Sequence, residues 1–314
     1  MLEDQLITAG YWFAYISLEL SALFLGISFL IGLITAYIPP KKVEHVLSKY
    51  GNGIFGNVLG SVFGGLLPFC SCSTIPALIG LINIGVPFRI AMSFLIASPL
   101  GVFNLAVVSL FFVMFGPKVA LLYIAFTFFG AILAGWLLDK FGLKSYLKKV
   151  RVVGGHDDAE TNTSEGSKRW GALKQKMRYS WGFTKSLYFQ MIPYILIGVG
   201  IGAFIYGFVP EDLLATYAGP SNPFAVPVAA AIGIPMYVRT ETMIPICYVL
   251  TEKGVGIGTI MALIIGGAGA SIPELTLLTS IFKRKLLIAY IASIFAIATL
   301  TGYIFNFLVP FLIA

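Results

Sequence analysis

The chain has 314 residues, of which 58% are hydrophobic and only 11% are charged. A soluble domain carries roughly 25% charged residues, so this chain has too little polar surface to face water on every side. Its net charge of +7 does not indicate nucleic-acid binding, because the stretch from Asp139 to Lys185 alone holds eleven Lys/Arg against five Asp/Glu, a balance of +6. The composition therefore excludes an ordinary soluble domain.

Long apolar blocks fill most of the chain, and several approach the ~20 residues that a helix needs to cross a bilayer. Alternating strand patterns with aromatic girdles are absent, so an outer-membrane barrel does not fit. The 34 glycines and 16 prolines are typical of membrane helices that are broken around a cavity. We therefore predict an all-α polytopic membrane protein with about eight to ten transmembrane segments.

The first half of the chain, residues 1–138, begins with an acidic N-terminus, where a cleavable signal would be basic, so we expect no signal peptide. Its apolar blocks are residues 14–38, 53–67, 77–84, 90–115 and 119–138. Two of them are too short to span comfortably and meet at a proline-bounded segment, 68–76, which predicts a hairpin or two short helices. Ser98-Pro99 predicts a break inside the fourth block.

A polar linker, residues 139–185, separates the two halves. Its middle, 154–167, is rich in Gly, Asp, Thr and Ser without periodicity, so we expect it to be mobile. Its flanks, 143–150 and 170–183, are predicted as basic amphipathic helices on the membrane surface. An excess of Lys and Arg is typical of cytoplasmic loops, so the linker is predicted to lie in the cytoplasm.

The second half, residues 186–314, repeats the order of the first. Its apolar blocks are 186–209, 224–233, 246–250, 257–282 and 286–313, with a proline-bounded segment at 235–245 and a break at 270–273. At a constant offset of 169, residues 75–96 and 244–265 share seven identities over 22 positions. The shared order of proline-bounded segment, Gly-Val turn and broken block predicts an internal duplication.

Charge placement predicts that the two halves have opposite orientations. With the linker inside, the positive-inside rule is obeyed by Arg89 and the triplet that begins at Lys283, and only Lys118 and Lys253 violate it. The first half then begins outside and the second half inside. Inverted repeats with discontinuous helices that meet near the midplane are typical of secondary transporters. No Walker motif is present, and we expect neither a cofactor nor a nucleic-acid partner.

The segment between Pro68 and Pro76 is the most informative one. It places thiols and hydroxyls at membrane depth, which is costly unless they line a polar cavity or bind a solute; the residues are Cys70, Ser71, Cys72, Ser73 and Thr74. A Cys-x-Cys pair on extended backbone can present both sulfurs to one soft centre, such as trivalent arsenic or a soft metal ion. The alternative is that both cysteines are ordinary packing residues.

Ionisable residues inside the apolar blocks are the other candidates, because such residues are costly in hydrocarbon. Arg239, Thr240 and Glu241 lie in the break bounded by Pro235 and Pro245, either as substrate and proton ligands or as a structural ion pair. Glu274 follows Pro273, at the place that mirrors Leu100, and Glu19 lies in the first span. Both are candidates for ion coupling.

Two further residues lie beside the breaks. Cys247 follows Pro245 and either completes a three-thiol site or faces lipid. Asn104 follows Pro99, and we expect it to hydrogen-bond the carbonyls that this break frees.

Around the Leu-Pro-Phe-Cys-Ser-Cys-Ser-Thr-Ile-Pro run at 67–76, the chain resembles the predicted permease family that includes ArsP-like organoarsenical efflux permeases and YraQ-like proteins. The Gly-Ile-Pro-Met-Tyr run at 233–237 is similar to that family's second repeat. The resemblance implies an inner-membrane permease for trivalent organoarsenicals or related thiophilic species. The charged residues at Arg239, Glu241 and Glu274 depart from it and would suit a cation better.

The sequence as a whole predicts a secondary transporter, not an enzyme, that exports a thiophilic solute. Cys70 and Cys72 are its predicted ligands, for a metal as well as for an arsenical, and Glu241, Glu274 or Glu19 its coupling residue. A channel, a permease for another small ion or sulfur compound, and a thiol-dependent intramembrane enzyme are the alternatives. Membrane lipid is an expected partner, and a homo-oligomer stays open.

Overall fold

In the computed structural model, described residues are 53–66, 71–148, 180–194, 224–234, 240–252 and 254–313, with positions between 15 and 33 and near 177 and 197. The side chains at 71–73 and a few others are outside this description. Every regular element within these ranges is a helix, and the strand-like pairing there is a single bridge between Leu147 and Phe282. The prediction of an all-α membrane protein is thus confirmed in its coarse form.

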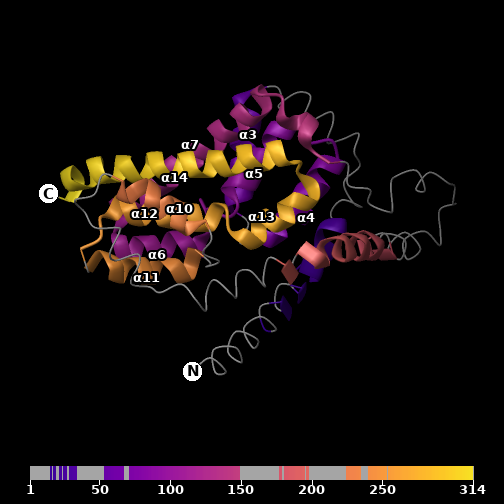
Figure 1. The fold of residues 1–314 in the computed structure, drawn as a ribbon, viewed down its shortest axis with the longest axis horizontal. Helices are drawn as coiled ribbons and strands as arrows, with labels where there is room; N and C mark the ends of the chain where they lie inside the picture. The colour runs from indigo at the N-terminus through magenta and orange to yellow at the C-terminus, as the bar shows by residue number, and fades with distance from the viewer. Residues whose placement is uncertain are drawn as a thin grey trace, which may run out of the picture.

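The described helices of the first half follow one another closely in the sequence. They are α3 (Ile54–Leu66), α4 (Ser71–Asn83), α5 (Phe88–Ala97), α6 (Leu105–Phe115) and α7 (Pro117–Lys140), followed by the short 3-10 helix η1 (Leu143–Tyr146). Those of the second half are α10 (Ala225–Gly233), α11 (Thr240–Glu252), α12 (Ile257–Gly269), α13 (Ile272–Ile281) and α14 (Arg284–Ile313). Figure 1 shows their arrangement.

Both predicted helix breaks inside long apolar blocks are present. The first separates α5 from α6, and the second separates α12 from α13, with a bend of 41° between these two helices. Pro99 lies in the first break, and Pro273 lies in the first turn of α13, where a missing N–H costs least. Ser98 and Ser271 are buried beside them. Each half therefore carries one discontinuous helix.

Glycines let helices pack at close range at matching places in the two halves. A Cβ atom on Gly64 of α3 would collide with the backbone carbonyl of Phe94 in α5, and one on Gly233 of α10 would collide with that of Leu263 in α12. Both pairs are related by the offset of 169. The turns before α5 and α12 contain Gly85 and Gly254 with φ of 88° and 89°, a conformation that glycine adopts without strain.

The long helices α7 and α14 pack against one another and run antiparallel (Figure 1). Gly130 of α7 lies against Ile297, while Phe126, one turn earlier, stacks edge-on against Phe305, two turns later in α14. In its own half, α7 packs on α5 and α14 packs on α12. Two corresponding helices thus occupy similar positions and point in opposite directions.

The described start of the linker is attached to the connection between α13 and α14. The amide of Lys148 donates to the carbonyl of Ile281, and the amide of Lys283 donates to the carbonyl of Tyr146. The ammonium group of Lys285 lies 5.2 Å from the centre of the Tyr146 ring. The prediction of an amphipathic helix over 143–150 is therefore wrong in its described part, because the backbone there pairs with the second half after one 3-10 turn.

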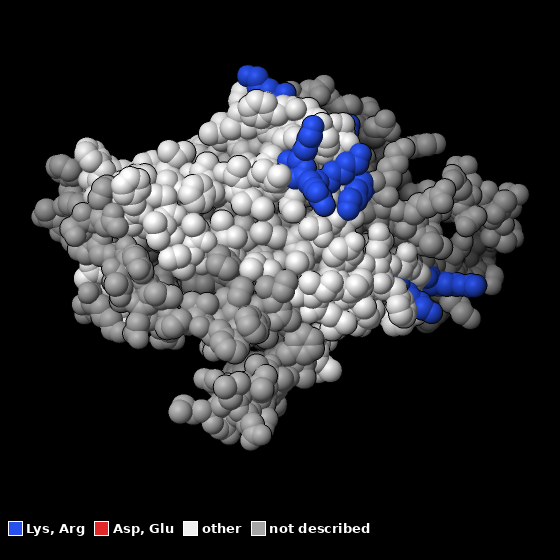
Figure 2. Space-filling model, viewed as in Figure 1, with Lys and Arg blue, Asp and Glu red and all other residues white. Residues whose placement is uncertain are grey.

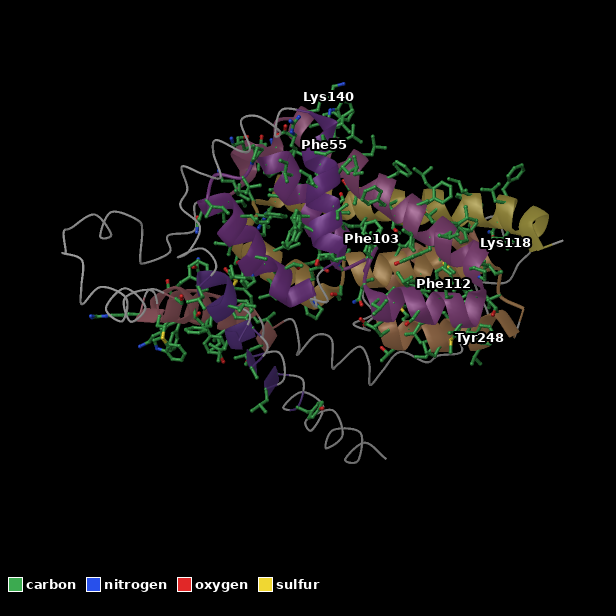
Figure 3. The ribbon with its side chains drawn as sticks, turned by 180° about the vertical axis from the view of Figure 1, so that it is seen from behind. Phe55, Phe103, Phe112, Lys118, Lys140 and Tyr248 are labelled. Atoms are coloured by element: carbon green, nitrogen blue, oxygen red, sulfur yellow. The ribbon has the colours of Figure 1, made fainter. Side chains whose placement is uncertain are left out.

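Basic side chains gather at this end of the molecule. Lys and Arg cluster on one face in Figure 2, where no acidic side chain of the described residues is visible. Lys140 lies at one end of α7 and Lys118 at the other (Figure 3). Three exposed basic residues, Lys283, Arg284 and Lys285, lie at the start of α14.

Two described helices, α7 and α14, are long and apolar enough to cross a membrane on their own, and the bent pair α12–α13 raises the number to three. Large apolar side chains on their surface, such as Phe129, Leu133, Ile288 and Phe307, are exposed. An exposed apolar surface of this kind indicates contact with lipid. Other described helices, such as α3 and α4, are too short to span alone, as the sequence predicts for 53–67 and 77–84.

Candidate functional site

The cysteine-containing segment is helical from Ser71 onward. Helix α4 begins at Ser71, includes Cys72 in its first turn and continues through Pro76. The prediction that Cys72 lies on extended backbone is therefore wrong, and Pro76 does not mark a break. Pro76 lacks an N–H, so it removes the helical donor for the carbonyl of Cys72. Thr74 is fully buried, whereas Pro68, Cys70 and the side chains of Ser71, Cys72 and Ser73 lie outside the description.

The second proline-bounded segment follows the same pattern. Helix α11 begins at Thr240 and continues through Pro245, so Pro245, like Pro76, is the sixth residue of its helix. It removes the helical donor for the carbonyl of Glu241. Pro235 and Arg239 precede α11 and lie outside the described residues, so the ion-pair prediction for Arg239 stays a prediction.

Thr240 and Glu241 contact the helix break of the other half. The hydroxyl of Thr240 donates to the carbonyl of Pro99 at 3.4 Å, and Asn104 Nδ2 donates to Glu241 Oε1 at 3.4 Å. Thr240 is buried and Glu241 is half-buried. The first turn of α11 is thus held against the break between α5 and α6, and it brings a carboxylate to that break.

Asn104 has a different role from the one expected. Its Oδ1 accepts from the amide of Ala106 at 3.0 Å, which makes Asn104 the N-cap of α6. Its side-chain amide donates to Glu241, while its backbone N–H donates to the carbonyl of Gly101 in the break. The hydroxyl of Tyr123 in α7 serves another carbonyl of the break, at 2.8 Å from Leu100 O.

Glu274 is fully buried in the first turn of α13. Its Oε1 lies 3.1 Å from the hydroxyl of Tyr290 in α14, and the same hydroxyl lies 2.7 Å from the carbonyl oxygen of Gly269 at the end of α12. A carboxyl group at a helix N-terminus is favourably placed relative to the helix dipole. The acid, the tyrosine and the end of the broken helix therefore form one hydrogen-bonded group.

Tyr123 and Tyr290 are site residues that the sequence reasoning missed. Each is buried in the long final helix of its half and donates to a carbonyl at the break, Leu100 O in one half and Gly269 O in the other. The structure therefore matches Leu100 with Gly269, 169 residues apart, and not with Glu274 as the sequence predicts. The two tyrosines are 167 residues apart, two fewer than the offset of 169, so the ungapped alignment of the halves does not pair them.

Cys247 is fully buried in α11 within the apolar core. Its counterpart at an offset of 169 is Leu78, which is also fully buried in α4, so lipid exposure is excluded and a packing role is favoured. Among the described residues, no three His, Cys, Asp or Glu side chains gather as metal ligands. The three-thiol prediction stays a prediction, as does a metal at Cys70 and Cys72. Glu19 lies outside the described residues.

The two halves contact one another in a crossed manner. Helix α11 packs against α6, the second part of the first broken helix, and α4 packs against α13, the second part of the other broken helix. Helix α4, which carries Cys72, therefore lies against α13, which carries Glu274. Helix α11, which carries Glu241, lies against α6, which Asn104 caps. Helices α4 and α11 thus each pack against the second part of the broken helix in the other half.

Residues 5–307 match the ArsP-type family whose description is "Predicted permease". The chain belongs to this permease family. The match covers nearly all of the sequence, including both discontinuous helices, so it confirms the resemblance predicted from the Pro-Phe-Cys-Ser-Cys run. Together with the apolar helices, it identifies the protein as a membrane permease.

Relatives of this permease occur in distant organisms. It is 32% identical to the UPF0718 protein MJ0584 of Methanocaldococcus jannaschii over 132 residues, which are 42% of this chain and 35% of that protein. It is 23% identical to the UPF0718 protein YcgR of Bacillus subtilis, over 84% of this chain and 86% of that one. A Streptococcus mutans protein named "Putative two-component membrane permease complex subunit" is 22% identical over 83% of each chain. No solved structure matches the permease significantly.

Proposed function

We propose that this permease is a secondary transporter that exports a thiophilic solute, such as a trivalent organoarsenical or a soft metal ion, across the cytoplasmic membrane. Cys70 and Cys72 bind the solute transiently, together with the hydroxyls of Ser71, Ser73 and Thr74. Glu274 or Glu241 carries the coupling proton. The observation that carries the proposal is the packing of α4, with Cys72 in its first turn, against α13, with buried Glu274 in its first turn.

Thiolates and thiols prefer soft, polarizable centres, and a buried carboxyl group in a membrane helix is a functional candidate by default. Two helices that carry these groups and pack together supply both a ligand and a proton site. Release requires weak binding, so two thiols assisted by hydroxyls suit transport better than a closed metal cage.

The proposal includes two inverted repeats, the first from 1–138 and the second from 186–314. Three sets of contacts support the repeats: the glycine pairs at Gly64 and Gly233, the tyrosine pairs at Tyr123 and Tyr290, and the crossed packing of α11 on α6 and α4 on α13. The antiparallel course of α7 and α14 supports the inversion. Inverted repeats with broken helices are the architecture of many secondary transporters.

The orientation that we propose places the linker, 139–185, in the cytoplasm. Lys140, Lys148 and the start of α14 lie at one end of the molecule, where the basic cluster is found (Figures 2 and 3). Lys118 at the far end of α7 is the described exception. Positive charge at the cytoplasmic end is the general rule for helical membrane proteins.

The test is growth and export in a strain that lacks its own arsenical permeases. Wild type, Cys70→Ser, Cys72→Ser and the double variant are compared on arsenite, methylarsenite, phenylarsenite, antimonite and soft metal salts. We expect resistance to at least one trivalent species with the wild type and its loss with the double variant, at equal amounts of protein in the membrane. Cys247→Ala is the matched control, because it removes a buried thiol outside the proposed site.

Full resistance in the double serine variant would contradict the thiol mechanism. No resistance to any of these species, with normal insertion, would contradict the proposed cargo while leaving the permease assignment in place. Everted membrane vesicles that accumulate radiolabelled arsenite at carrier rates, without ionic currents, separate a transporter from a channel. An unchanged chemical form of the solute excludes a thiol-dependent enzyme.

A further inference from the structure

In the broken helix α12–α13, the carbonyl of Gly269 has no backbone donor four residues later. Pro273 has no N–H, so it cannot donate to the carbonyl of Gly269 four residues earlier. The hydroxyl of Tyr290 takes this place at 2.7 Å, and it also lies 3.1 Å from Glu274 Oε1. Tyr290 and Glu274 are both fully buried, so water does not replace this hydroxyl easily.

A neutral tyrosine hydroxyl has one hydrogen to donate, and two acceptor oxygens lie within its reach. If Glu274 is ionised, the hydroxyl serves either the carboxylate or Gly269 O, but not both. If Glu274 carries a proton, its own O–H donates to the tyrosine oxygen and the tyrosine O–H donates to Gly269 O. Only the protonated carboxyl group completes both hydrogen bonds with the observed geometry.

We propose that Glu274 is a proton-carrying residue and that Tyr290 transmits its protonation state to the break between α12 and α13. When the carboxyl loses its proton to water, the tyrosine keeps its own and turns it toward the carboxylate. Gly269 O then loses its donor. The 41° bend between α12 and α13 is thereby linked to one proton.

Several elements that pack against α13 carry titratable groups. Within the described residues, α13 packs against α4 and α14, and its Ser280 contacts Met191 of the segment 180–194, whose titratable residues are Lys185, Tyr188 and Tyr194. Glu274 is the titratable residue of α13, and α12 has none; α4 contributes Cys72, and α14 contributes Tyr290, Tyr303 and the basic pair at its start. Lys148 reaches α13 at its other end, where its ammonium group donates to Thr279 O. Tyr290 is a titratable side chain in hydrogen-bond contact with Glu274.

The first half provides a natural comparison. The Tyr123 hydroxyl donates to Leu100 O at 2.8 Å in the same way, but the carboxylate of Glu241 is hydrogen-bonded to Asn104. Tyr123→Phe therefore removes a tyrosine hydroxyl from a helix break without removing the hydrogen bond between Glu274 and Tyr290. It is the matched control for Tyr290→Phe.

Infrared difference spectroscopy of the purified protein in lipid nanodiscs, between acidic and alkaline pH, tests the proton site without a transported solute. We expect a protonated-carboxyl band that shifts in D2O, is absent in Glu274→Gln, and moves in frequency and midpoint pH in Tyr290→Phe. Tyr123→Phe should leave it unchanged. A band that persists in Glu274→Gln, or is unaffected by Tyr290→Phe, would overturn the proposal.

Hydrogen exchange tests the link to the break. After correction for intrinsic pH dependence, the amides around residues 266–276 should lose at least tenfold protection in the wild type as Glu274 loses its proton. Glu274→Gln retains an amide donor for Tyr290, so it should fold and keep the protection of the acidic form at every pH. Equal pH dependence in wild type and Glu274→Gln would overturn the link.

The coupling role of Glu274 rests on the proposed export function. A transport assay distinguishes a failure of the coupling role from a failure of the export function. In vesicles, Glu274→Gln should lose accumulation of arsenite driven by a pH gradient and retain arsenite exchange without a gradient. No arsenite transport by the wild type, with the infrared band and its variants as expected, refutes the cargo and leaves the switch. Gradient-driven transport by Glu274→Gln at the wild-type level refutes the coupling role.

Discussion

Replacing Gly64 by alanine should destabilise the permease by about as much as the same change at Gly233. The Cβ atom added at Gly64 would collide with the carbonyl and Cα of Phe94, and the one added at Gly233 would lie 2.6 Å from the carbonyl oxygen of Leu263. These are backbone atoms of a packed helix and cannot rotate away. The helices α3 and α5, or α10 and α12, must therefore separate.

The magnitude follows from two opposing terms. Overpacking of a core costs about 1–3 kcal/mol, and a backbone collision lies at the upper end of that range. Alanine gains about 1 kcal/mol over glycine in a helix. We expect each variant to lose about 2 kcal/mol of unfolding free energy, and the two losses should agree within about 1 kcal/mol if the halves are equivalent.

The assay is equilibrium unfolding of the purified protein in detergent, followed by circular dichroism. The matched control is Gly182→Ala, because Gly182 is helical and a Cβ there meets nothing within 4 Å; it should be neutral or slightly stabilising. If Gly64→Ala and Gly233→Ala behave like this control, the close helix approach is wrong. A large loss in one variant only would refute the equivalence of the two halves.

Three other substitutions test the site. Tyr123→Phe leaves the buried carbonyl of Leu100 without its donor and should lower the unfolding free energy by about 1–3 kcal/mol in the same assay. Tyr290→Phe should lower it more, since Gly269 and Glu274 both lose a partner. Equal losses would argue against a hydroxyl shared by Gly269 and Glu274. Asn104→Ala removes the cap of α6 and should lower the unfolding free energy by about 1 kcal/mol. If the 3.4 Å hydrogen bond from Asn104 Nδ2 to Glu241 Oε1 forms in the membrane, a double-mutant cycle with Glu241→Ala should show a coupling energy of about 0.5–1.5 kcal/mol. Cys247→Ser buries a hydroxyl in an apolar core and should cost about 1–3 kcal/mol while resistance per folded molecule stays at the wild-type level; a loss of resistance without a loss of stability would support the three-thiol site instead.

The sequence predicted the helical class, the two breaks and the order of the segments, because each depends on local signals. Apolar length defines the long helices α7 and α14, and Ser98-Pro99 and Pro273 mark the breaks that the structure contains. The Gly-Val turns at Gly85 and Gly254 appear at matching places with matching φ. Local signals of this kind survive folding because few tertiary contacts compete with them.

The sequence-based prediction was wrong where a proline can lie either at a helix boundary or inside a helix. Pro76 and Pro245 looked like boundaries, but each lies inside a helix at its sixth residue, because at membrane depth a helix satisfies most backbone groups even when one donor is missing. Asn104 and the linker start at 143–148 were misread for another reason. Their partners, Glu241 and the connection before α14, are more than 130 residues away in sequence, and no local pattern identifies them.

The offset of 169 makes the roles of the two halves comparable residue by residue. Cys72 corresponds to Glu241, and each lies in the first turn of a helix that packs against a broken helix of the opposite half. The sequence thus has a cysteine at this position in one half and a glutamate at the equivalent position in the other. The contact of α4 with α13 brings the helix that carries Cys72 beside the helix that carries Glu274, so under the proposed function the thiol and the coupling acid belong to packed helices of opposite halves.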